Sequence, residues 1–214
     1  LVLPVGGSLS LQATNIDFLS SITAPGGSIS ATAFNYSPFL YTEQVVSEAL
    51  IGQPAPEVVE GTGIIRIGAG VALNASGTIS DERPTGRDTA NARRALDGGS
   101  VTLEGYSILA GSGSSITASG GLAVNGRGKY SMGKGGSISL LAGKDPVLGT
   151  SVGGTLSLPS TLEAYSGATG GSLTLQAVRA ILGGASTKGG QTLSLASDFF
   201  QKGGCLLYTS PSPR

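Results

Sequence analysis

Histidine and tryptophan are absent from this chain of 214 residues, and cysteine occurs only once, as Cys205. Without histidine there is no imidazole base, no Ser-His-Asp triad and no example of the commonest metal ligand. Cys205 lies in the segment CLLYTSPSPR, which does not continue the sequence pattern of the rest of the chain. We therefore also expect no thiolate nucleophile and no zinc site. These absences predict a protein that is not an enzyme and that holds no metal or cofactor.

Charge is also scarce. Charged residues make up 12% of the chain, with 13 basic and 13 acidic side chains and a net charge of zero, so no basic surface for nucleic acid is expected. No apolar run approaches the ~18 residues of a membrane span, which excludes membrane insertion by a helix. Yet 39% of the residues are hydrophobic and 36 are glycine. This composition predicts many short strands joined by tight turns.

A Gly-Gly doublet followed by alternating polar and apolar residues recurs along the chain. The doublets begin at residues 6, 26, 98, 135, 153, 170 and 189. Most neighbouring doublets are 17–20 residues apart. The spacing of 37 between the doublets at 98 and 135 is interpreted as two periods. The long gap from 26 to 98 contains two irregular segments. A fixed period of this kind indicates a repeat architecture.

The alternation after each doublet predicts strands with one buried and one exposed face. The residues expected in the core are Leu103, Leu140, Leu158, Leu175 and Leu195, with Thr102, Ser139, Ser157, Thr174 and Ser194 exposed between them. A period of roughly 17–20 residues is too short for helical repeats or propeller blades and suits one coil of a parallel β-helix. We therefore predict an all-β, right-handed parallel β-helix over 1–204, with Gly-Gly providing turns of positive φ and room for the neighbouring coil.

Two segments interrupt the repeat and are predicted to be loops that leave the solenoid. Residues 34–60 contain four glutamates and no basic residue, with a short helix expected after Thr42, and residues 81–97 contain eight charged side chains. If these loops contact a ligand, the side chains that we expect to do so are Tyr36, Phe39, Tyr41, Arg83 and Arg87. The alternative is that the aromatic residues pack back onto the core.

The last ten residues, CLLYTSPSPR at 205–214, do not continue the repeat. They resemble the translation of a sequencing adapter, so we interpret them as non-native and exclude them from the fold. The first residues enter a coil directly, and we interpret the chain as an internal fragment. Exposed strand edges at both ends predict end-to-end association.

The succession IIRIGAGVALNASGTISDERPTGR, LDGGSVTLEG, GKGGSISLLAG and GGSLTLQA resembles the repeat region of filamentous-haemagglutinin-like exoproteins over roughly 1–204. The resemblance implies a β-helical shaft, an extracellular location at the bacterial surface, and adhesion to a host glycan or protein receptor. It also implies export through an outer-membrane partner, the two-partner secretion route.

Two other functions remain open. Parallel β-helices also carry enzymes that act on polysaccharides, and Asp81, Glu82, Arg83, Arg87 and Asp88 provide the carboxylates that such chemistry uses. Against that, these carboxylates lie in one loop and not on successive coils. The third hypothesis is the passenger segment of a single-chain autotransporter, which the repeats alone do not distinguish from the first.

Overall fold

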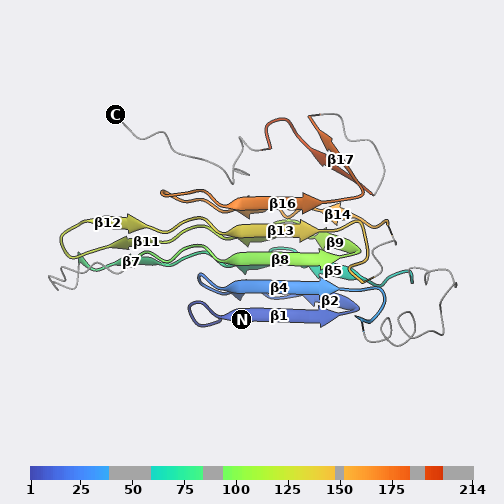
Figure 1. The fold of residues 1–214 in the computed structure, drawn as a ribbon, viewed down its shortest axis with the longest axis horizontal. Helices are drawn as coiled ribbons and strands as arrows, with labels where there is room; N and C mark the ends of the chain where they lie inside the picture. The colour runs from blue at the N-terminus through green and yellow to red at the C-terminus, as the bar shows by residue number, and fades with distance from the viewer. Residues whose placement is uncertain (39–58, 84–93, 148–151, 184–190, 200–214) are drawn as a thin grey trace.

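The computed structural model describes residues 1–38, 59–83, 94–147, 152–183 and 191–199 (Figure 1). All eighteen elements in these ranges are β-strands, so the chain is all-β as predicted. No helix in the described part of the chain is long and apolar enough to span a membrane. The helix expected after Thr42 lies outside the described residues.

The largest sheet, called here the main sheet, is built from five of the segments that follow Gly-Gly doublets. Its strand order is β1 (Ser8–Ala13), β4 (Ser28–Ala33), β8 (Ser100–Gly105), β13 (Ser137–Leu141) and β16 (Ser172–Gln176). All neighbours are parallel, and the register places equivalent residues side by side. One apolar row therefore runs across the sheet: Leu9, Ile29, Val101, Ile138 and Leu173.

Two further parallel sheets contain the strands that follow. The second sheet consists of β2 (Asn15–Phe18), β5 (Ile64–Ile67), β9 (Ser107–Ala110) and β14 (Leu156–Ser157). The third consists of β3 (Ile22–Thr23), β6 (Ala72–Asn74), β10 (Ser115–Thr117) and β15 (Thr161–Glu163). The chain visits the three sheets in the same order four times, and the buried side chains of all three form one core.

The length of one circuit through the three sheets differs from the prediction. The first circuit advances the main-sheet register from Ser8 to Ser28, as the expected coil length requires. Later circuits advance it from Ser100 to Ser137 and from Ser137 to Ser172, which is nearly twice as far. The expected coil length is therefore wrong beyond the first circuit. The spacing of 37 is one circuit and not two, because extra strands lie between the third sheet and the main sheet.

Two of the predicted core segments do not join the main sheet. Leu156, after the doublet at 153–154, lies in β14 opposite Ile108 of β9. Leu193 lies in β18 (Thr192–Leu195), which pairs with β17 (Arg179–Leu182). Alternation indicates a strand with one buried face, but the same pattern suits any sheet around the core, so it did not specify the partner.

The predicted core is confirmed in part. Leu103 and Leu140 are fully buried and Leu195 is 7% exposed, whereas Leu158 and Leu175 are only partly buried. Among the residues expected to be exposed, only Thr174 is; Thr102, Ser139, Ser157 and Ser194 are half-buried.

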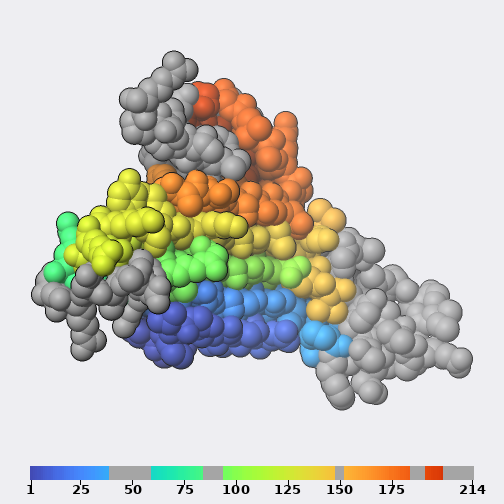
Figure 2. Space-filling model, turned by 60° about the vertical axis from the view of Figure 1, so that its left-hand side comes forward, coloured from blue at the N-terminus to red at the C-terminus, as the bar shows by residue number. Residues whose placement is uncertain are grey.

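A smaller sheet, called here the side sheet, projects beyond the main sheet (Figures 1 and 2). It contains β7 (Ile79–Asp81), β11 (Leu122–Val124) and β12 (Tyr130–Met132). β11 is parallel to β7 but antiparallel to β12, an exception to the parallel pairing of the other sheets. The reversal occurs at a tight turn that the Asn125 side chain closes by accepting hydrogen bonds from the backbone N–H groups of Arg127 and Lys129.

Candidate functional site

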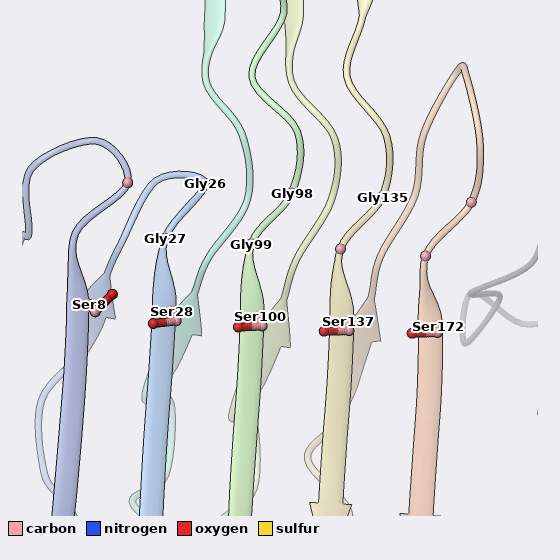
Figure 3. Close-up of a pocket in the computed structure, with 14 residues that line it drawn as sticks. Ser8, Gly26, Gly27, Ser28, Gly98, Gly99, Ser100, Gly135, Ser137 and Ser172 are labelled. Carbon is pink, nitrogen blue, oxygen red and sulfur yellow. The ribbon is translucent and has the colours of Figure 1, made fainter.

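The Gly-Gly-Ser starts of the five main-sheet strands line up into a shallow groove across the sheet (Figure 3). The groove has a volume of about 760 Å³, and its lining consists entirely of glycine and serine. The serine hydroxyls of Ser28, Ser100, Ser137 and Ser172 lie in one row along it. We call this feature the Gly-Ser groove.

Close approach of the adjacent strand requires the second glycine of the doublets before β4, β8, β13 and β16. Ser100 N–H donates to the carbonyl of Gly27 at 2.9 Å, and Ser137 N–H donates to that of Gly99 at 3.0 Å. A Cβ on Gly99 would lie 1.8 Å from the Gly27 oxygen, and one on Gly136 would lie 1.9 Å from the Gly99 oxygen. The doublet therefore leaves room for the neighbouring strand, as predicted.

The other predicted role of the doublet, a turn of positive φ, holds at only two main-sheet strands. Gly6 and Gly26 have φ of 73° and 60°, whereas the first glycines before β8, β13 and β16 have no positive φ. At those three strands the doublet leaves room for the neighbouring strand but adds no residue of positive φ. The groove presents hydroxyl and backbone groups, so its chemistry is hydrogen bonding without a charged group or a base to activate a serine.

Hydrogen bonds join the two chain segments at which the first predicted contact loop begins and ends. The side chain of Asn35 accepts a hydrogen bond from Val59 N–H at 2.8 Å and donates one to the Val59 carbonyl at 3.0 Å. Asn35 N–H in turn donates to Asp145 Oδ2 at 2.5 Å, and Val147 N–H donates to Asp145 Oδ1 at 2.9 Å. We call these four residues the base clasp. It holds together the two chain segments that bound residues 36–58.

Asp145 is fully buried, and sequence reasoning missed it. A buried carboxylate needs hydrogen-bond donors, and backbone N–H groups from two distant segments supply them here. Its sequence neighbours, Lys144 and Pro146, are typical of an exposed turn. Nothing local marks this aspartate as a structural residue.

Of the predicted contact residues in this loop, Tyr36 is half-buried beside the base clasp. Phe39 and Tyr41 lie outside the described residues.

In the second loop, Arg83 is exposed and engages Asp81 of β7 through its Nε and Nη2 atoms, the closest distance being 2.6 Å. The hydrogen bond from the Arg83 side chain lowers the pKa of Asp81, and the same bond raises the pKa of Arg83. Arg87 and Asp88, the other members of the predicted charged cluster, lie outside the described residues.

A second exposed ion pair joins adjacent strands of the second sheet, with Arg66 Nη1 3.3 Å from Asp17 Oδ1. Within the described ranges, no three carboxylate, histidine or cysteine residues lie close enough together to hold a metal ion. The outward rows of the main sheet carry mainly hydroxyl side chains, such as Ser10, Ser30 and Thr102.

Comparison of the chain with models of known protein families, with curated proteins and with solved structures found no match.

Proposed function

We propose that this chain is a segment of a right-handed parallel β-helix that serves as the shaft of a large secreted bacterial surface adhesin. The observation that carries the proposal is the repeated visit to three parallel sheets in one order, with the Gly-Gly-Ser starts in register. A solenoid of this kind buries one continuous core and gives a rod. Crossovers between parallel strands are almost always right-handed, which supports the handedness.

The resemblance to filamentous-haemagglutinin-like exoproteins supports the rest of the proposal. It implies an extracellular location and an outer-membrane secretion partner. In this proposal the shaft itself is inert, and the loops that leave it make the contacts with a host glycan or protein. Rows of serine and threonine side chains run across adjacent strands of the main sheet, and such rows suit a shaft. An active site on the same scaffold would instead use acidic and basic side chains on successive strands.

Single-molecule pulling tests the shaft role. Adjacent circuits contact only their neighbours, so we expect stepwise unfolding, with extension steps of roughly 120 Å for each of the longer circuits. One cooperative rupture of the whole chain at low force would argue against a load-bearing solenoid.

Incubation with a panel of polysaccharides separates the shaft from an enzyme on the same scaffold. We expect no release of reducing or unsaturated ends. Release that disappears in Asp81→Asn would instead establish the enzyme.

A further inference from the structure

A pocket of about 350 Å³ lies where β5 and β9 begin in the second sheet, away from the Gly-Ser groove. Its size falls within the ~300–1,000 Å³ of small-molecule sites. Apolar and polar side chains line it together: Val59, Ile64 and Tyr106, with Glu60, Thr62 and Ser107. We call it the Tyr106 pocket.

One wall of the pocket is a backbone segment that two asparagine side chains fix. Asn15 Nδ2 donates to the Gly61 carbonyl at 2.9 Å, and Ile64 N–H donates to Asn15 Oδ1 at 3.0 Å. Asn35 holds Val59 through the base clasp. Because hydrogen bonds restrain both ends of residues 59–64, Glu60 and Thr62 are presented by a preformed wall.

Tyr106 also lines the pocket, and two glycines make room for its side chain. A Cβ on Gly153 would lie 2.0 Å from the tyrosine hydroxyl, and a Cβ on Gly63 would lie 2.9 Å from the Tyr106 Cβ. Both glycines have positive φ, 154° and 71°. The ring is therefore seated in a position that the surrounding backbone is shaped to accept.

In the part of the chain that the structure describes, Glu60 is the one charged residue in the lining of the Tyr106 pocket. Glu60 is exposed and has no ion-pair partner among the described residues, and neither lysine nor arginine is in the lining. A carboxylate without a counter-ion beside an aromatic ring attracts a cation.

We propose that the Tyr106 pocket binds an alkylammonium group, either the lysine side chain of a partner polypeptide or a quaternary ammonium compound. Glu60 supplies the counter-charge, the Tyr106 ring supplies cation–π attraction, and Val59 and Ile64 contact the alkyl carbons. A neutral sugar can stack on the ring and donate hydroxyl hydrogen bonds to Glu60, but it carries no charge for the carboxylate to attract. The inference rests on this pocket alone and does not depend on the proposed shaft role.

Saturation-transfer and shift-perturbation NMR of the whole chain tests the proposal with two cations and their neutral isosteres. The cations are Nα-acetyl-lysine N-methylamide and choline, and the isosteres are Nα-acetyl-norleucine N-methylamide and 3,3-dimethyl-1-butanol. We expect at least one cation to bind and both isosteres to bind at least about fivefold more weakly, with affinity falling as salt is raised. The stronger of the two cations identifies the source.

Two variants and a control locate the site. Glu60→Gln is expected to weaken cation binding about threefold to tenfold, and Tyr106→Leu by a similar factor. Glu104→Gln, on β8 of the main sheet, removes a carboxylate outside the pocket lining and should leave binding unchanged. Circular dichroism confirms that each variant is folded. Methyl glucoside serves as the neutral-sugar probe in the same measurements. Equal binding of cations and isosteres, tighter binding of methyl glucoside than of either cation, or an affinity unchanged by Glu60→Gln would overturn the proposal.

Discussion

The middle and the edges of the main sheet carry the same sequence motif but bury it to different degrees. In β8 and β13, Val101, Leu103, Ile138 and Leu140 are completely buried, and Ile29 of β4 is 1% exposed. The equivalent residues of the edge strands β1 and β16, such as Leu9 and Leu175, are only partly buried. A middle strand is covered from both sides and an edge strand from one, so the same leucine contributes more to stability in the middle.

The largest expected difference comes from truncating one leucine in each place. Leu140 of β13 and Leu175 of β16 are direct partners in the parallel register. Leu140→Ala should lower the free energy of unfolding by about 2–5 kcal/mol because it leaves a closed cavity. Leu175→Ala should cost roughly half as much, since part of that side chain already faces water. Urea or thermal denaturation measures both.

Ser139→Ala is the matched control for these leucines, because it changes the neighbouring residue on the outward face of β13. It should shift the stability by no more than about 0.5 kcal/mol. Equal losses in Leu140→Ala and Leu175→Ala would show that β16 is covered to the same extent as the middle of the sheet.

Substitution of the doublet glycines also distinguishes the middle of the main sheet from its edge. A Cβ on Gly99 would meet the Gly27 carbonyl oxygen of the paired strand at 1.8 Å. A Cβ on Gly7 would meet atoms of its own preceding segment, the Pro4 carbonyl oxygen at 2.8 Å and Leu3 Cβ at 3.2 Å. Gly99→Ala must separate two paired strands in the middle of the sheet, and we expect a loss of about 1–3 kcal/mol. Gly7→Ala at the edge should cost less, because the short segment before β1 can shift. A loss for Gly7→Ala that matches that of Gly99→Ala would contradict the strand-contact explanation.

The strands themselves could be predicted because their signal is local. Residues 100–105 and 137–141 alternate with a period of two over one strand length, and that pattern alone is enough to indicate a half-buried strand. The need for glycine before them was also predictable, since a doublet repeated at the same place marks a close approach. Both features depend only on residues next to one another in the sequence.

Pairing and site geometry could not be predicted in the same way, because they depend on residues far apart. Asn35 and Asp145 are separated by 110 positions and meet only once the sheets have formed. The same holds for Glu60 and Tyr106, which come from different circuits and share one pocket. The length of a circuit was misjudged because Gly-Gly doublets precede strands of more than one sheet. Gly120–Gly121 precedes β11 of the side sheet and Gly153–Gly154 precedes β14 of the second sheet, so the spacing between doublets is not the length of a circuit.

The smallest expected effect lies in the side sheet, where the charged pair Asp81–Arg83 is open to solvent. The Arg83 hydrogen bond lowers the pKa of Asp81, so any stability from this carboxylate is present above its unfolded pKa and is lost as pH falls through the lower folded value. NMR titration should show the Asp81 pKa rising toward its ordinary value in Arg83→Gln, while Arg66→Gln, which removes the other ion pair, leaves it unchanged. The melting temperature of Arg83→Gln should stay close to that of the unmodified chain, because water screens an exposed pair. A clear drop in melting temperature would mean that the side sheet supports the core as strongly as the main sheet does, and the contrast between a buried middle and a weakly contributing periphery would then fail.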